Sequence, residues 1–206
     1  KYFARFFENH GLLNVVNRPQ WYTIPGGSQE YVKKLSSSFI DNVRLNTPVM
    51  EIRRKPNFVE IFSAVGKERF DEVVLACHSD QALRLLKDAT KEETEILGSI
   101  PYQRNEAVLH QDISLLPNRK KAWASWNYHL DHTQQETVAV TYNMNILQGI
   151  KAPETFCVTL NDTESINPAR ILGRFNYAHP QFTVAGVNAQ ARWSEIYLVF
   201  FGTYLR

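Results

Sequence analysis

Apolar and polar residues alternate in two stretches in the first half of the chain, Val49–Arg53 and Val59–Ile61. Residues typical of turns follow each stretch, Pro56-Asn57 after the first and Val65-Gly66-Lys67 after the second. Alternation with a period of two, bounded by such turns, is the pattern of short strands with one face on a core. The sequence therefore predicts three short strands in succession, arranged as an antiparallel meander.

The segment that follows the meander, Val73–Cys77, is an unbroken apolar run. It is too short for a helix and β-branched at its start, so it predicts a strand covered on both faces, as in a parallel sheet between layers. Ser79 is a suitable N-cap for the helix expected next. A meander followed by a buried strand, a tight turn and a helix indicates an α/β layer of the nucleotide-binding type. The apolar stripe of that helix consists of Ala82, Leu83, Leu85 and Leu86.

Further helices are predicted at Lys1–Asn9, around Tyr31–Leu35, and at Thr90–Leu97 with Thr90 as its cap. The glycine pair Gly26-Gly27 precedes the second of these helices. Two glycines at a helix N-terminus allow close approach of an anion to free N–H groups, but they also fit a plain turn with Ser28 as N-cap. Both interpretations stay open at this point.

From Asn105 onward the pattern changes to that of longer antiparallel strands. In the segment Lys121–Tyr128 the alternation places Trp126 and Tyr128 on one face and Trp123 on the other. A sheet with an aromatic side fits either a ligand-binding surface or a core beneath covering helices. The elements predicted in this half are strands at 107–110, 121–128, 137–142, 156–160, 171–177 and 196–201, and a helix at 184–193.

The composition is that of a globular protein, with 206 residues of which 44% are hydrophobic and 12% aromatic. A formal net charge of +2 gives no basic surplus that would indicate nucleic acid as a partner. Cys77 and Cys157 lie within apolar runs, which favours buried thiols over a disulfide. No hydrophobic run approaches the ~20 residues of a membrane span. No signal peptide is visible, so we expect a cytoplasmic protein that does not span a membrane.

Motifs for common enzyme chemistry are missing from the sequence. His129 and His132 are a close pair of metal-binding residue types, but no cysteine or glutamate completes a site, so we expect no metal. The sequence has no Gly-x-Ser-x-Gly elbow, no P-loop and no dinucleotide fingerprint with three glycines. The motifs alone therefore predict no particular reaction.

Several longer segments resemble one family, the predicted NAD/FAD-binding proteins of the flavin-containing amine oxidase superfamily that are associated with cyclopropane fatty acid synthases. The resemblance implies an α/β fold of mixed α+β content. It would combine a partial FAD-binding, doubly wound layer carrying the β-meander with an antiparallel-sheet substrate domain over the flavin. The segments are FARFFENHGLL (3–13), RPQWYTIPGGSQEYVKKL (18–35), FDEVVLACHSDQALRLL (70–86), YQRNEAVLHQDISLLPNRKKAWASWNY (102–128), VAVTYNMNILQGI (138–150) and FCVTLN (156–161).

The domain division that the resemblance implies assigns 36–86 and 194–206 to the partial FAD-binding domain, and 1–35 and 87–193 to the substrate domain. The family's pyrophosphate-binding strand, glycine-rich loop and helix would lie upstream of Lys1. The chain is therefore expected to be incomplete at both ends and to bind FAD weakly or not at all by itself.

The resemblance also carries over individual positions. Val49 matches the residue whose backbone meets the adenine end of FAD, and Gly26 and Gly27 match the glycine pair near the flavin. Gly202-Thr203 matches the start of the second FAD motif, although Thr203 replaces the usual Ala or Asp. The lysine that many amine oxidases use near flavin N5 has no counterpart that the resemblance assigns, so the catalytic residues are unknown. The candidates for apolar walls of a substrate pocket are Trp123, Trp126, Tyr128 and Tyr142.

The function implied is that of an FAD-dependent, amine oxidase-like oxidoreductase acting on an apolar, lipid-like small molecule. The flavin would carry the hydride chemistry, and a cyclopropane fatty acid synthase is an expected partner. Two alternatives stay open. One is a non-catalytic lipid-binding or scaffolding module of the same fold, and the other is an inactive truncated product.

Overall fold

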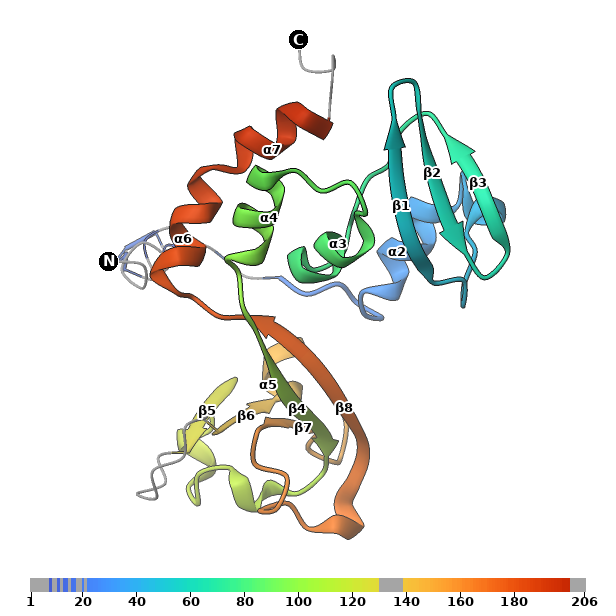
Figure 1. The fold of residues 1–206 in the computed structure, drawn as a ribbon. Coiled ribbons are helices and arrows are strands. Elements are labelled where there is room, and N and C mark those ends of the chain that lie inside the picture. Colours follow the sequence, from blue (N-terminus) through green and yellow to red (C-terminus); the bar gives the residue numbers. More distant parts are fainter. Residues whose placement is uncertain are drawn as a thin grey trace. The chain divides into compact units, whose positions relative to one another are not determined.

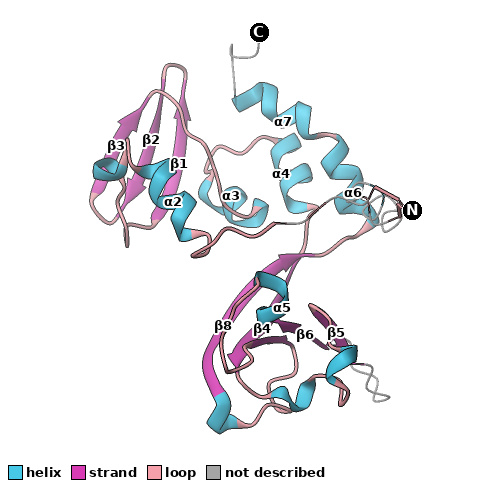
Figure 2. Cartoon of the chain, turned by 180° about the vertical axis from the view of Figure 1, so that it is seen from behind, coloured by secondary structure: helices cyan, strands magenta, loops and turns pink. Residues whose placement is uncertain are grey.

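The structure is a computed structural model that describes residues 22–129 and 139–200, together with the isolated positions 8, 11, 13, 14, 16, 17 and 20. The chain divides into two compact units, Lys1–Val43 and Arg44–Arg206. Figures 1 and 2 show the helices and strands of the described residues. Most of the helix predicted at Lys1–Asn9, and the site candidates Gly202 and Thr203, lie outside the described residues.

The described part of the first unit contains the helix α2 (Gln29–Ser36) and the short 3₁₀ helix η1 (Ile40–Asn42). The prediction of a helix around Tyr31–Leu35 is thereby confirmed. Ser28 is the N-cap residue of α2, as the interpretation of a plain turn expects, but its side chain makes no capping hydrogen bond.

The second unit begins with the predicted meander, which is confirmed. Strands β1 (Val49–Lys55), β2 (Phe58–Ser63) and β3 (Gly66–Phe70) form an antiparallel sheet in the order β1-β2-β3. One face of this sheet packs on a small core centred on Ile52, Val59 and Leu86, because alternate residues of β1 and β2 point to the same side.

The apolar run Val73–Cys77 does not form the predicted buried strand. Val73 and Leu75 pack against the meander core, whereas Val74 is 77% exposed. A strand in a parallel layer needs a neighbour for its backbone N–H and C=O groups, and this run has no strand partner within the described residues. The only parallel bridge in that part of the chain joins Ile52 and Leu86.

Four helices follow or pack beside the meander in the second unit. Helix α3 contacts β1 and α4, and α4 contacts α6 and α7. The strand predicted at 196–201 is wrong, because those of its residues that are described continue a helix; a short apolar run does not separate helix from strand by periodicity alone. The helices are α3 (Ser79–Leu85), α4 (Lys91–Gly98), α6 (Val184–Ala191) and α7 (Trp193–Phe200).

A buried ion pair fixes β1 to the start of α4. Arg54 donates from both terminal nitrogens to Glu93, at 2.6 and 2.8 Å, and from Nε to Asp88 at 2.8 Å. Thr90 caps α4, since its hydroxyl accepts from the Glu93 backbone N–H, and the Glu93 carboxylate accepts from the Thr90 N–H. The predicted cap at Thr90 is thus confirmed, and the same carboxylate serves both the cap and Arg54.

The second sheet has five antiparallel strands in the order β5-β6-β7-β4-β8. Strand β5 is shorter than predicted, because Lys120–Ala122 form a 3₁₀ turn and the Asn127 side chain bonds the backbone of Ala124 on both its N–H and C=O. The strands are β4 (Tyr102–His110), β5 (Trp126–His129), β6 (Ala139–Asn143), β7 (Cys157–Leu160) and β8 (Ile171–Pro180), with α5 (Met144–Gln148) between β6 and β7.

The mixed helix and antiparallel-sheet content agrees with the expected fold class. Among the helices of the described ranges, none combines the length and apolar character needed to cross a bilayer.

Candidate functional site

The five-stranded sheet has a buried face that is unusually polar. Thr141, Thr159 and His110 are completely buried on it, and Cys157 lies beside them. The His110 Nε2 and Thr159 Oγ1 atoms are 2.7 Å apart, and the hydroxyls of Thr159 and Thr141 are 2.8 Å apart. This chain of side chains links β4, β7 and β6 in addition to their backbone ladder.

The hydrogen bonds of His110 define its neutral form. Its Nδ1 accepts the backbone N–H of Asp112, so the ring proton is on Nε2, which donates to Thr159. Burial lowers the pKa of His110, although the nearby Asp112 carboxylate acts in the opposite direction. A histidine with both nitrogens bonded and no access to water holds the sheet together and has no free position for acid–base work.

The opposite face of the same sheet carries aromatic residues toward solvent, and we call it the aromatic face. Trp126 pairs in register with Tyr142, and their rings meet edge to face with centroids 6.2 Å apart. Tyr128 lies two residues along β5 on the same side. On β8 the rings of Phe175 and Tyr177 stack with centroids 6.2 Å apart, and the register places them on this face too.

Exposure distinguishes the aromatic face from an ordinary core. Trp126 is 54% and Tyr128 is 66% exposed, and Phe175 and Tyr177 are similarly open. Burial, with a smaller effect of Tyr128, raises the pKa of Tyr142, so its phenol is neutral at physiological pH. In the strands as described, the residues in register on this face include no Asp, Glu, Lys or Arg.

The four candidates for pocket walls are therefore divided. Trp126, Tyr128 and Tyr142 come together on the aromatic face. Trp123 lies before β5, where its indole N–H donates to the Pro117 carbonyl at 2.8 Å. Sequence reasoning did not single out Phe175 and Tyr177, although their spacing of two within a predicted strand was a usable signal.

Val49 lies at an irregular position of β1. The register shifts between Val49 and Glu51, which leaves Met50 without a cross-strand partner. A bulge of this kind exposes backbone N–H and C=O groups that another molecule can bond. The site is therefore compatible with the backbone contact to adenine that the resemblance implies.

The glycine pair of the first unit has the conformation that only glycine adopts easily. Gly26 and Gly27 have φ values of +85° and +88°, and the Gly27 N–H donates to the Ile24 carbonyl at 2.9 Å. A Cβ on Gly26 would lie 2.9 Å from Glu30 Cγ, whereas a Cβ on Gly27 would meet nothing within 4 Å. The backbone at Gly27 is therefore open to close approach by a flat group. Gly26 and Gly27 belong to the first unit, whereas Val49 belongs to the second.

A cavity of about 500 Å³ lies within the second unit, and the sequence did not indicate it. Cys77 is exposed at this cavity, contrary to the prediction of a buried thiol, whereas Cys157 is buried as predicted. Burial raises the pKa of Cys157 to about 11. The main walls of the cavity are Val73, Leu75, Ala82, Leu97, Tyr102 and Trp193.

A metal site requires several ligand side chains close together. In the described ranges, no group of three or more His, Cys, Asp or Glu side chains could hold a metal ion. Of the predicted close pair His129 and His132, the second residue lies outside the described ranges.

Comparison with solved structures supports the class of protein that this fold defines, an FAD-dependent oxidoreductase fold of mixed helix and sheet. A fatty acid isomerase from P. acnes that produces CLA matches with a TM-score of 0.52 and 16% identity, over 82% of this chain and 43% of its own. Cyclohexylamine oxidase from Brevibacterium oxydans IH-35A matches with a TM-score of 0.52 and 12% identity, over 79% of this chain and 44% of its own. The chain thus spans less than half the length of these solved structures, and at such identities they show the fold alone.

A family model described as flavin containing amine oxidoreductase matches residues 4–111, just over half of the chain. The chain belongs to this family. A comparison with curated protein sequences gave no match. The narrower association with cyclopropane fatty acid synthases, and the division into FAD-binding and substrate domains, stay predictions.

Proposed function

We propose that this chain supplies the substrate-binding part of an FAD-dependent oxidoreductase whose substrate is an apolar, lipid-like molecule. The observation that carries the proposal is the aromatic face, where Trp126 pairs with Tyr142 and Tyr128 lies two residues along the same strand as Trp126. Trp126 and Tyr128 are more than half exposed, and Tyr142 is half-buried. Large apolar side chains on an open surface are typical of a binding site.

The absence of fixed charge on the described strands of the aromatic face favours an apolar substrate over a protonated amine. A desolvated ammonium group needs a carboxylate or a comparable partner, because burial of an unpaired charge is costly. The names of the two similar structures cover both classes, a fatty acid and an amine. This face suits the apolar chain of a fatty-acid-like molecule, whose carboxylate has no cation on the described strands here and would have to stay in solvent.

The buried network of His110, Thr159 and Thr141 would act as a positioning support. It ties three neighbouring strands, so the rings on the opposite face keep their spacing when a ligand arrives. Neutral Tyr142 would contribute an apolar wall that excludes water and would not act as a base.

Bound FAD would supply the hydride chemistry. On this chain, the open backbone at the Val49–Glu51 bulge and the turn at Gly27 are the positions that fit contact with such a cofactor. The described residues offer no glycine-rich loop for the pyrophosphate, so the chain by itself would hold FAD weakly.

Calorimetric titration with a long-chain fatty acid and with cyclohexylamine tests the substrate class. We expect the fatty acid to bind and cyclohexylamine to give no heat. Tyr128→Ala should weaken fatty-acid binding by about tenfold, in line with the loss of a large aromatic contact. Tyr22→Ala, which removes an equally large and more exposed ring from the first unit, is the matched control and should leave the affinity unchanged. Preference for the amine, or equal loss in both variants, would contradict the proposal.

The expected alternative, a non-catalytic lipid-binding module, would use the same aromatic face and give the same titration. The enzyme and the binding module differ in one measurement, made on a chain that carries the complete cofactor domain. Reduction of its flavin by the bound lipid would show the enzyme, and an unreduced flavin would favour the module.

A further inference from the structure

The meander has a second face that the proposed function does not use, and we call it the basic face. Its residues are those that the register places opposite to the core side of the sheet. Arg53, Glu60 and Arg69 form one row across the three strands, flanked by Glu51, Phe62 and Lys67 on one side and by Lys55 and Phe58 on the other.

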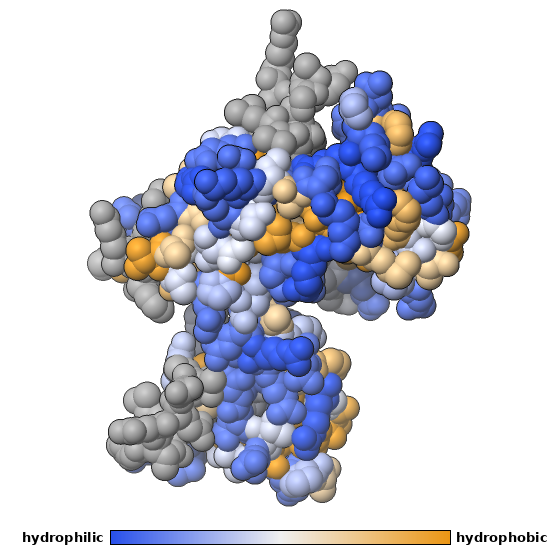
Figure 3. All heavy atoms as spheres, viewed as in Figure 1, coloured by the Kyte–Doolittle hydropathy of each residue, from blue (hydrophilic) through white to orange (hydrophobic). Residues whose placement is uncertain are grey.

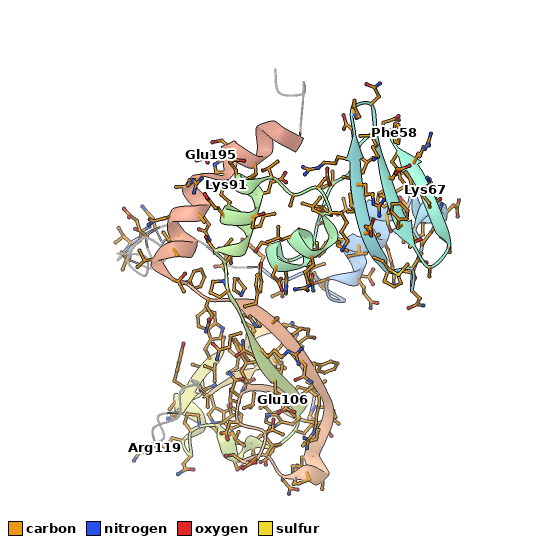
Figure 4. All side chains as sticks on the ribbon, in the orientation of Figure 1. Phe58, Lys67, Lys91, Glu106, Arg119 and Glu195 are labelled. Atoms are coloured by element: carbon orange, nitrogen blue, oxygen red, sulfur yellow. The ribbon has the colours of Figure 1, made fainter. Side chains whose placement is uncertain are left out.

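Charge is concentrated on the basic face although the chain as a whole is nearly neutral. Four cations against two carboxylates leave a local net charge of +2, on an area only three strands wide. The side chains of Arg53, Lys67 and Arg69 are 50%, 49% and 64% exposed. Figure 3 shows hydrophilic residues over much of this sheet, with hydrophobic ones between them, and Figure 4 labels Phe58 and Lys67 on it.

The two aromatic rings of the basic face are covered by guanidinium groups. The Arg53 guanidinium lies 5.1 Å from the Phe62 ring centroid, and that of Arg69 lies 4.6 Å from the Phe58 centroid. Stacking on a ring restrains each guanidinium. The Arg53 Nε donates to the Glu51 carboxylate and the Arg69 Nε faces Glu60, so the terminal nitrogens of the two groups are the atoms that phosphate oxygens could reach. The stacking also covers the ring faces on which nucleic-acid bases would stack, so the arrangement does not suit single-stranded nucleic acid.

Glu60 lies at the centre of the basic face and stays ionised. The hydrogen bond from Lys67, at 3.1 Å, lowers the pKa of Glu60, and Arg69 approaches the same carboxylate to 3.7 Å. This carboxylate is shared by Lys67 and Arg69, and it reduces the repulsion between them. Lys55 at the β1–β2 turn adds charge at the outer end.

We propose that the basic face binds peripherally to the anionic surface of a phospholipid membrane. The cations are spread over a sheet face, which suits a surface of many phosphate groups better than a single deep-bound anion. Val65, 62% exposed at the β2–β3 turn beside Lys67, offers an apolar side chain at the edge of the same sheet. The inference stands on the meander alone and does not depend on the aromatic face.

Vesicle co-sedimentation of the whole chain tests this inference. We expect binding to mixed phosphatidylcholine–phosphatidylglycerol vesicles that falls as salt is added, and no binding to vesicles of phosphatidylcholine alone. The combined substitution Lys55→Gln and Arg69→Gln should lower the partition coefficient by about tenfold or more. It leaves Lys67, the nearest partner of Glu60, in place. The single substitution Lys55→Gln leaves both stacked guanidinium groups in place and should give a smaller loss in the same direction.

The matched control is Lys120→Gln with Lys121→Gln, which removes the same charge from an exposed turn of the other sheet. It should retain the affinity of the unaltered chain, and circular dichroism should report the same fold for all variants. Equal loss in the control, no binding to anionic vesicles, or a preference for polyglutamate over those vesicles would each overturn the proposal, the last in favour of an acidic protein partner.

Discussion

The imidazole Nε2 of His110 and the hydroxyl of Thr159 lie 2.7 Å apart on one face of the five-stranded sheet, and both residues are fully buried. The two residues come from neighbouring strands, β4 and β7, so a side-chain bond reinforces the backbone ladder at the centre of the sheet. The aromatic face lies on the other side of these strands. The buried bonds of His110, Thr159 and Thr141 thus hold together the strands that carry the aromatic face.

Removal of the Thr159 hydroxyl should destabilise the protein. Thr159→Val keeps the shape of the side chain but leaves the His110 Nε2–H and the Thr141 hydroxyl short of a buried partner. We expect the free energy of unfolding to fall by about 1–3 kcal/mol in a denaturant titration. The control is Thr155→Val, at a half-buried loop position, for which we expect a change below about 0.5 kcal/mol. Similar effects in both variants would mean that the network adds nothing.

Acidification should destabilise the protein in a window set by His110. Burial lowers the pKa of His110 in the folded chain below its usual value of 6.5, so the unfolded state binds more protons as the pH falls through that value. Its contribution to stability is therefore complete above about pH 6.5 and is lost progressively below it. Denaturant titrations at several pH values should show this loss, and His110→Gln should flatten the curve in that window. A curve with the same slope in the variant would assign the titration to another group.

The ion pair between Arg54 and Glu93, which connects β1 to α4, should contribute strongly to the stability of the fold. Arg54→Met would leave the Glu93 carboxylate, which has no exposed surface, without its cation. We expect a loss of about 3–5 kcal/mol in the free energy of unfolding. Arg84→Met removes the exposed Arg84–Asp80 pair of α3 and should cost below about 0.5 kcal/mol. A small loss for Arg54→Met would show that water enters and solvates Glu93.

FAD should bind this chain only weakly. The backbone at the Val49 bulge of the second unit and the turn at Gly27 of the first unit are each compatible with contact to a cofactor, but no described loop cradles the pyrophosphate. Titration of the chain into FAD, followed by flavin fluorescence, should give a shallow curve without a stoichiometric end point. A sharp end point at one FAD per chain would contradict this expectation.

The sequence predicted well those elements whose pattern is set by local contacts. The meander needs only its own alternation and turns, and the cap at Thr90 needs only Glu93 three residues later. The apolar runs at Val73–Cys77 and at 196–201 were misread as strands. A short apolar run can form a strand, a helix or a packed loop, depending on the segments that lie beside it in the folded chain. The local pattern of residues does not contain this information.

The candidate site was partly predictable for the same reason. The alternation in β5 placed Trp126 and Tyr128 on one face, and the register with β6 added Tyr142. The exclusion of Trp123 depends on the bond from its indole to Pro117, and the addition of Phe175 depends on the pairing of β8 with β4. The bond to Pro117 and the pairing of β8 with β4 both arise only in the folded chain, so the spacing of residues in the sequence could not predict them.

Quenching of tryptophan fluorescence by a dibrominated fatty acid tests the central claim most directly, because bromine quenches only those indoles that lie close to the bound chain. We predict saturable quenching of the intact protein that is largely lost in Trp126→Phe and retained in Trp193→Phe, whose indole lines the separate cavity of the second unit. Quenching that survives in Trp126→Phe and disappears in Trp193→Phe would place the apolar ligand in that cavity and contradict the assignment of the aromatic face as the substrate-binding surface.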